Sequence, residues 1–157
     1  KVCPKGVFEM VTIHWLDMIF HHFNVTKIYK PQLTNLSKVG TSYDNSNIRL
    51  EIDKKIMAEI FCTYTSPLID KKIFIFDNGI VEQNENEILI KGPAINYDRN
   101  KFFKQPKTIK KINISEKKDY QESLFKSVKF FLDIANKKKH FSKKENTQSL
   151  KVNDMII

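Results

Sequence analysis

The spacing of apolar residues along this chain changes near Asn24. Residues 7–23 carry apolar side chains at intervals of three and four, which predicts a helix that buries more than one face. From residue 25 to residue 114 the interval is two, which is typical of strands whose two faces differ. The predicted strands cover residues 25–30, 48–52, 56–64, 72–76, 80–81, 87–90 and 108–114.

Turn residues separate these strands by short intervals. Asp53-Lys54-Lys55 predicts a tight connection, and Pro67 predicts the end of a strand. Asn78-Gly79 lies between two apolar runs, a hairpin signal because both central residues of such a turn need positive φ. Short connections of this kind predict mainly antiparallel pairing.

After the last strand the interval returns to that of a helix. Ser115 is placed to cap a second helix, and Lys137–Lys139 are expected in its last turn. Its apolar stripe comprises Tyr120, Leu124, Val128, Phe131, Leu132 and Ala135. A third helix is expected from Leu150. The expected fold class is α+β, a broad and mainly antiparallel open sheet with helices packed on one face, in a single domain over residues 1–157.

Composition narrows the class of protein. The chain has 157 residues, of which 41% are hydrophobic and 11% aromatic, enough for a packed core and too many for a disordered chain. A net charge of +9 is typical of proteins that bind nucleic acid or an acidic membrane surface. However, Arg49 and Arg99 are the two arginines among 27 basic residues, and arginine is the residue suited to bidentate phosphate and base recognition. We therefore expect no nucleic-acid partner and no membrane partner.

Two cysteines, no leader and no apolar run long enough to cross a bilayer predict a cytoplasmic protein. The chain begins at Lys1 without Met and stops within the apolar run Met155-Ile156-Ile157. We expect it to be a piece of a longer protein, cut at both ends.

The first helix holds the densest group of ionisable side chains: Glu9, His14, Asp17, His21 and His22. His14 and Asp17 are three residues apart, so they share one helix face. An imidazole accepts protons near neutral pH, and a neighbouring carboxylate can orient it. One alternative is a histidine that only hydrogen-bonds a carboxylate. Another is a metal site of His14, Asp17 and His21, but it lacks a convincing fourth ligand, and no metal is expected.

Other aromatic and thiol side chains are interpreted as structural. Trp15, Phe20 and Phe23 lie at helical spacing and are expected in the core, and Cys62 is expected to be a small buried hydrophobe. Tyr97, Phe102 and Phe103 lie among lysines, as in a single-strand nucleic-acid platform. A loop tucked over the sheet edge, or a loop beside a substrate, fits these residues better.

The segment from Gly6 to Asp17 resembles the opening of the C-terminal domain of the Gfo/Idh/MocA oxidoreductases, the glucose–fructose oxidoreductase and inositol dehydrogenase family. The family pattern is a glycine-led helix whose His is followed three residues later by Asp. Nearly the whole chain follows the family's order of elements: the strand at 44–53, the strand ending at Pro67, the hairpin at 76–79, the Gly92-Pro93 loop and the helix beginning Tyr120-Gln-Glu-Ser.

The resemblance implies that this chain is the substrate-binding and dimerisation half of an NAD- or NADP-dependent oxidoreductase. The reaction would move hydride between a sugar or polyol carbon and nicotinamide. His14 matches the family's catalytic His, and Asp17 matches the following Asp, which supports the site. A homo-dimer or a dimer of dimers through the open sheet face is implied, with the cofactor held by an N-terminal Rossmann domain absent from this chain.

The chain departs from the family pattern at two points. Many members carry an Asp four residues before the His, where this chain has Met10, and Thr12 replaces a small residue; Glu9 is the possible substitute substrate contact. No Gly-x-Gly-x-x-Gly occurs, so the chain alone should not turn over substrate. Two alternatives remain open: a non-catalytic binding or scaffold module of the same fold, and a basic nucleic-acid-binding domain.

Overall fold

The computed structural model of the chain describes residues 4–67, 69–92, 97–140, 147, 150–152 and 154. These residues form an α+β protein whose paired strands are antiparallel, as the pattern predicts. The chain divides into two compact units, residues 1–68 with 140–157 and residues 69–139; the single domain expected over residues 1–157 stays a prediction.

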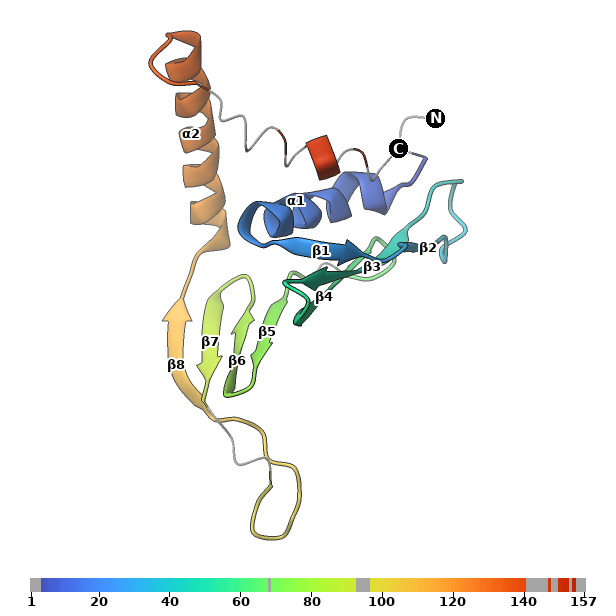
Figure 1. Cartoon of the computed structure of the whole chain (residues 1–157), viewed down its shortest axis with the longest axis vertical. Coiled ribbons are helices and arrows are strands. Elements are labelled where there is room, and N and C mark those ends of the chain that lie inside the picture. Colours follow the sequence, from blue (N-terminus) through green and yellow to red (C-terminus); the bar gives the residue numbers. More distant parts are fainter. Residues whose placement is uncertain are drawn as a thin grey trace. The chain divides into compact units, whose positions relative to one another are not determined.

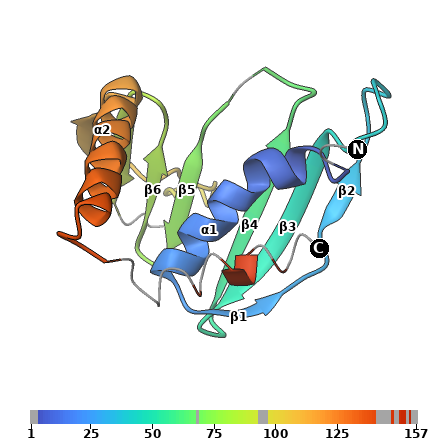
Figure 2. The ribbon, with the colours of Figure 1, turned by 90° about the horizontal axis from the view of Figure 1, so that it is seen from above.

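The first unit is a helix on a four-stranded sheet. Its helix begins with a π-helical segment, η1 (Phe8–Thr12), and continues as α1 (Ile13–His22). The strands are β1 (Val25–Ile28), β2 (Gln32–Thr34), β3 (Asn45–Ile52) and β4 (Ile56–Thr63). β3 pairs with β1 and β2 along one edge and with β4 along the other. α1 crosses one face of this sheet (Figures 1 and 2).

The core of the first unit lies between the helix and the inner face of the sheet. Alternate residues of β3, Ser46, Ile48, Leu50 and Ile52, are buried, which is the period of two that predicted the strand. The buried apolar residues are Val7, Phe8, Leu16, Ile19, Ile48, Leu50, Ile52, Ile60, Cys62 and Val152. Trp15 and Phe20 pack against this cluster, as predicted, whereas Phe23 is exposed.

The turn between β3 and β4 has the geometry that was expected for the hairpin at Asn78-Gly79. Asp53 and Lys54 have φ of 52° and 58°, and the Lys55 N–H donates to the Ile52 carbonyl at 3.1 Å. Both central residues at positive φ are the mark of a type I′ turn. The Asp53 carboxylate also accepts a hydrogen bond from Asn24 at 2.9 Å, which joins the turn to the end of the helix.

The second unit is a meander of β5 (Lys72–Phe76), β6 (Gly79–Gln83), β7 (Glu87–Lys91) and β8 (Thr108–Asn113). The hairpin at residues 76–79 is confirmed, but the reason given for it is wrong. Phe76 pairs with Gly79, so the turn is Asp77-Asn78, and neither residue is among the described ones with positive φ. Gly79 is required instead because a Cβ there would lie 2.5 Å from the Lys91 carbonyl oxygen.

The pairing among the described strands gives two four-stranded sheets, so the single broad sheet that was expected is not shown. Pro67, which has no backbone N–H to donate, follows the end of β4. β2 was not predicted, since a strand of three residues after Pro31 carries no periodic signal.

No helix among the described residues has the length and apolarity needed to span a membrane.

The expectation that helices cover the sheet is met by α1 in the first unit and not by α2 (Glu116–Ala135) in the second. Every residue from Lys117 to Leu132 is exposed, including the predicted apolar stripe as far as Leu132. Ser115 occupies the N-cap position, but its side chain makes no capping hydrogen bond.

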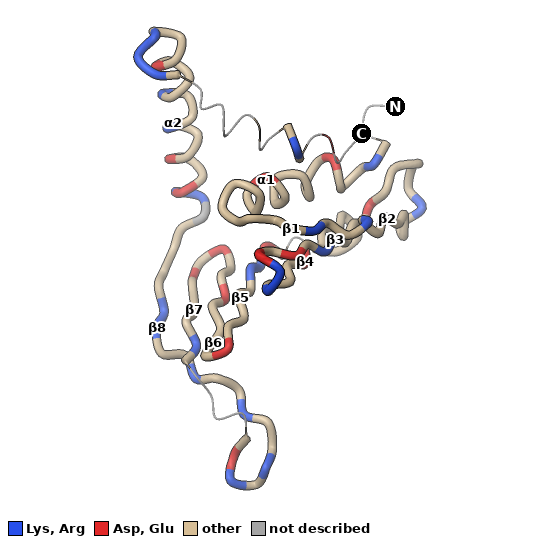
Figure 3. Tube along the Cα trace, viewed as in Figure 1, with Lys and Arg blue, Asp and Glu red and all other residues tan. Residues whose placement is uncertain are grey.

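The C-terminal end of α2 also differs from its prediction. Lys137–Lys139 follow the last turn instead of lying in it, as the blue segment at the end of α2 in Figure 3 shows. Lys137 has φ of 60°, and the N–H groups of Lys138 and Lys137 donate to the Asp133 and Ile134 carbonyls. This is a Schellman motif with lysine at the position that glycine usually takes.

Two remaining expectations concern irregular segments. Tyr97, Phe102 and Phe103 were expected in a loop tucked over the sheet edge or beside a substrate. Their exposed fractions of 51%, 70% and 84% do not fit the first of these, and the second stays a prediction. A third helix was expected from Leu150, and the described residues 147, 150–152 and 154 are helical. Residues 93–96, Met155–Ile157 and Cys3 lie outside the described residues.

Candidate functional site

The predicted site lies at the start of the first helix, and Gly6 determines how that helix begins. Gly6 has φ of +54°, and a Cβ placed on it would lie 1.9 Å from the carbonyl oxygen of Tyr43. The next residue, Val7, donates its N–H to the same oxygen at 2.9 Å. The helix start is therefore held directly against the backbone before β3, at a distance that only glycine permits.

The π-helical segment η1 leads directly into the residues proposed to carry chemistry. Its last residue, Thr12, is fully buried and packs beside the buried Ser46 of β3. Their hydroxyl oxygens are 2.5 Å apart, and Thr12 Oγ1 also lies 3.5 Å from the Val7 carbonyl oxygen. π-helical turns are rare in proteins as a whole, and those that occur are often found at functional sites. Here the turn is anchored to the sheet through a buried pair of hydroxyls.

His14 and Asp17 both lie in α1, and both side chains are exposed. Residues three apart on an α-helix have Cβ atoms about 5–6 Å apart, so an imidazole and a carboxylate here face the same volume of solvent. His21 and His22 are also exposed, and their ring centroids are 4.9 Å apart in an edge-to-face arrangement. The helix therefore brings His14 and Asp17 to one accessible surface.

Glu9 and Met10 occupy the turn before His14. The Glu9 carboxylate accepts a hydrogen bond from the Lys5 N–H at 3.0 Å, so one of its oxygens stabilises the start of the helix, where negative charge is favourable. Met10 is 52% exposed. An exposed thioether thus stands where the family pattern has a carboxylate, and the nearby carboxylate of Glu9 has a structural partner.

Asp44 was not singled out from the sequence, yet it organises the loop that holds the helix start. Its two carboxylate oxygens accept the N–H groups of Leu36 and Ser37, each at 2.8 Å. Removal from water raises the pKa of the Asp44 carboxyl, but hydrogen bonds from Ser37, Leu36 and Asn45 outweigh this effect and lower the pKa to about 2. The loop ends at Tyr43, whose carbonyl meets Gly6.

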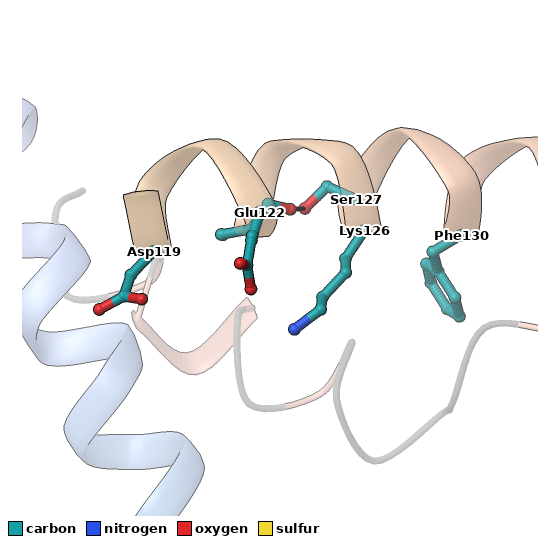
Figure 4. Close-up of a pocket in the computed structure, with 6 residues that line it drawn as sticks. Asp119, Glu122, Lys126, Ser127 and Phe130 are labelled. Atoms are coloured by element: carbon teal, nitrogen blue, oxygen red, sulfur yellow. Dashed lines mark hydrogen bonds between the residues drawn. The ribbon is translucent and has the colours of Figure 1, made fainter. Parts of the chain in front are cut away.

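A shallow depression elsewhere on the surface does not offer a second site. It is lined by Asp119, Glu122, Ser123, Lys126, Ser127 and Phe130 (Figure 4). All six residues belong to α2, so the described residues supply one wall and no enclosure. Within the described part of the chain, no three His, Cys, Asp or Glu side chains are grouped to hold a metal ion. His14, Asp17 and His21 therefore do not form the alternative metal set.

Comparison of the chain with protein-family models, with curated proteins and with solved structures finds no match.

The sequence contained a signal for part of what was missed. Thr12 falls at the buried helix positions shared with Phe8, Leu16 and Ile19, and Ser46 falls on the inward phase of β3. A hydroxyl at a core position needs a hydrogen-bonding partner. Two such residues in facing elements predict each other, although nothing in their spacing predicts a π-helical turn.

Proposed function

We propose that this chain is the substrate-binding and self-associating part of a nicotinamide-dependent oxidoreductase that acts on a sugar or polyol hydroxyl. The carrying observation is the arrangement at the helix start. Gly6 is locked to the Tyr43 carbonyl, η1 is anchored through Thr12 and Ser46, and His14 is presented at the surface directly after them. A buried, hydrogen-bonded support beneath an exposed imidazole is what a positioned proton acceptor requires.

The chemistry assigned to this chain is proton transfer. Oxidation of an alcohol removes the hydroxyl proton and a hydride from the adjacent carbon, and the proton needs an acceptor within hydrogen-bond reach. In this proposal His14 accepts that proton at its imidazole nitrogen, and Asp17, three residues further along α1, helps to orient the ring.

The cofactor would be NAD or NADP, and this chain does not supply a site for it. The described residues contain no glycine-rich turn between a strand and a helix, the element that binds a dinucleotide pyrophosphate. The proposal therefore places the dinucleotide in an N-terminal half of the whole protein. This chain binds the substrate and handles the proton.

The partner proposed beside the substrate is a second copy of the chain, in a dimer or a dimer of dimers. The pairing register places Phe74, Val81, Ile88, Ile90 and Ile112 on one face of the β5–β8 sheet, and Phe74 and Ile112 are 42% and 37% exposed. An uncovered apolar sheet face is typical of an association surface.

The opposite face of the same sheet carries three ion pairs beside the exposed Ile73 and Ile75, against the one pair of Lys72 with Asp70 at the first face, which makes it the less suitable surface for self-association. Glu82 contacts Lys91 at 2.5 Å and Lys71 at 3.3 Å, and Glu87 contacts Lys111. The Lys91 ammonium lowers the pKa of Glu82, against the opposing effect of burial. Covering this face would remove those charges from water at a cost in free energy.

A non-catalytic binding module of the same fold is the second candidate. Met10 favours it, because a thioether cannot hydrogen-bond a sugar hydroxyl as a carboxylate does. The bond between Glu9 and the Lys5 N–H favours it as well, since it gives Glu9 a structural use. In this case the helix start would bind a ligand without proton transfer.

The test uses the whole natural protein that contains this chain. Its coding sequence upstream of Lys1 is read, the whole protein is expressed, and nicotinamide reduction is followed with NAD and with NADP against D-glucose, D-xylose and myo-inositol. We expect turnover that falls at least a hundredfold in His14→Ala, on the scale of lost general-base catalysis. His22→Ala, which removes an exposed histidine of the same helix, should retain full turnover.

Three results discriminate between the candidates. Equal turnover in His14→Ala and the unaltered protein would refute the proton-acceptor role. Binding of a sugar without nicotinamide reduction by any variant would favour the binding module. An upstream sequence with no dinucleotide-binding turn would remove the oxidoreductase proposal altogether.

A further inference from the structure

The loop between β7 and β8 ends in a folded tip. Tyr97 and Phe103 form an isolated antiparallel bridge, and their ring centroids are 5.0 Å apart at an interplanar angle of 33°. The Asp98 carboxylate accepts the N–H groups of Asn100 and Phe102 at 2.8 and 3.0 Å. The Asp98 N–H donates to the Phe102 carbonyl at 2.9 Å. The tip therefore has a defined conformation before it meets any partner.

The tip exposes three large aromatic side chains to solvent. Phe102 is 70% exposed and Phe103 is 84% exposed, while Tyr97 is 51% exposed. In Figure 1 this loop extends from the ends of β7 and β8, away from the other end of β8, where α2 begins. Exposed aromatic residues gathered at a single projecting point are characteristic of a binding surface.

Positive charge surrounds these aromatic residues. Arg99, Lys101, Lys104 and Lys107 lie within the same segment, 97–107, whose acidic residue is Asp98; the tube of this loop carries several blue Lys and Arg positions in Figure 3. The Asp98 carboxylate is already hydrogen-bonded to the loop backbone. The tip therefore carries exposed aromatic side chains and four cationic residues in one short segment.

We infer that residues 97–107 form a docking tip for an anionic phospholipid surface. Aromatic rings are favoured at the boundary between headgroups and acyl chains, and neighbouring Lys and Arg side chains are attracted to anionic headgroups. The internal hydrogen bonds lower the entropic cost of docking, because the tip does not have to order on binding. This function is separate from the proposed oxidoreductase site and departs from the expectation of no membrane partner.

Single-stranded nucleic acid fits the same tip less well. Strand-binding sites combine a basic groove that follows the phosphate backbone with aromatic faces open to bases. The tip projects and is not a groove, and the rings of Tyr97 and Phe103 lie against each other. One short loop also offers few phosphate contacts compared with a groove.

The experiment is co-sedimentation of the full chain with two kinds of vesicle, pure phosphatidylcholine and phosphatidylcholine mixed with phosphatidylserine. We expect binding to the mixed vesicles that weakens as salt is added. The double variant Phe102→Ser/Phe103→Ser should bind at least about tenfold more weakly. Phe125→Ser, at a residue of α2 that is 72% exposed, is the matched control and should bind as the unaltered chain does.

A charge variant separates the two contributions. Lys101→Glu/Lys104→Glu should lose the preference for phosphatidylserine, whereas Lys117→Glu/Lys118→Glu on α2 should keep it. Circular dichroism checks that each variant is folded, and the exposure of all these residues predicts that it is. Equal binding to both vesicle types, equal binding by the Phe102/Phe103 variant, or no sedimentation would overturn the inference. Binding to an oligo-dT strand that requires the same residues, without vesicle binding, would replace it with nucleic-acid recognition.

Discussion

Replacing Gly6 with alanine tests whether the helix start is held as the structure describes. The added Cβ would lie 1.9 Å from the Tyr43 carbonyl oxygen and 2.9 Å from the Tyr43 carbonyl carbon and nitrogen. All three are backbone atoms, so no flexible side chain can move away. Contacts below 3.0 Å are essentially never seen for a Cβ, so the helix start and the loop must separate by more than an ångström.

The expected cost has two parts. An alanine at φ of +54° costs roughly 1–2 kcal/mol because of its left-handed conformation. The separation also breaks the hydrogen bond from Val7, which is fully buried, to Tyr43. An unsatisfied buried N–H costs roughly 1–3 kcal/mol. We therefore expect Gly6→Ala to lower the free energy of unfolding by about 2–5 kcal/mol, a large part of the roughly 5–15 kcal/mol typical of a folded domain.

Gly40→Ala is the matched control for this prediction. Gly40 also has a positive φ, +73°, but a Cβ there has no neighbour within 4 Å. It should therefore cost only the conformational part, roughly 1–2 kcal/mol. Urea unfolding followed by circular dichroism measures both variants. Equal losses in Gly6→Ala and Gly40→Ala would show that the contact with Tyr43 contributes nothing and would refute the description of the helix start.

Two further predictions concern buried polar groups. Thr12→Val and Ser46→Ala should each lower the unfolding free energy by roughly 1–3 kcal/mol, because each leaves the other hydroxyl without its partner, 2.5 Å away. The double variant should lower the unfolding free energy by less than the sum of the two single losses. If urea unfolding showed the two losses to be strictly additive, Thr12 and Ser46 would not form a hydroxyl pair. Asp44 has a folded pKa of about 2, below the ordinary value of 3.8. Its contribution to stability is therefore complete above about pH 4 and is lost as the pH falls through about 2. In Asp44→Asn, the urea concentration at the unfolding midpoint should depend less on pH in that pH range than it does in the unaltered chain. The same dependence in both would contradict the lowered pKa of Asp44.

The periodic elements were predictable because their signals are local. The intervals along residues 7–23 predicted the first helix, and the alternation at Ile48, Leu50 and Ile52 predicted the inward face of β3. The position of His14 and Asp17 on one helix face also followed from spacing alone. Such patterns depend on residues close in sequence, so they survive without knowledge of the fold.

The tight turn at Asp53-Lys54-Lys55 was predicted correctly, but the turn at Asn78-Gly79 was assigned wrongly because distant backbone decided it. Asn78-Gly79 carries the stronger turn signal, yet positive φ at both central residues occurs at Asp53-Lys54. Gly79 is needed because the Lys91 carbonyl of the neighbouring strand approaches it. A dipeptide preference describes what a turn tolerates, whereas the pairing of the strands determines which conformation it adopts.

The candidate site likewise has a part that the sequence shows and a part that only the structure shows. The proposed proton acceptor, His14, and its neighbour Asp17 are visible in the sequence, as is the glycine that leads the helix. Their support is not, because Thr12 meets Ser46 from 34 residues away and Gly6 meets the Tyr43 backbone. The π-helical turn, a rare form of helix, is in this chain accompanied by these contacts with distant residues.

By itself, the sequence determined the number and kind of most elements, the buried phase of β3, and the candidate proton acceptor. The tertiary structure decided that the strands divide into two sheets, that α2 leaves its apolar stripe exposed, and that Phe102 and Phe103 project from a folded tip. Periodicity shows that an apolar face exists, because side-chain direction repeats along the backbone. Which segment covers that face, if any does, depends on contacts between residues far apart in the chain.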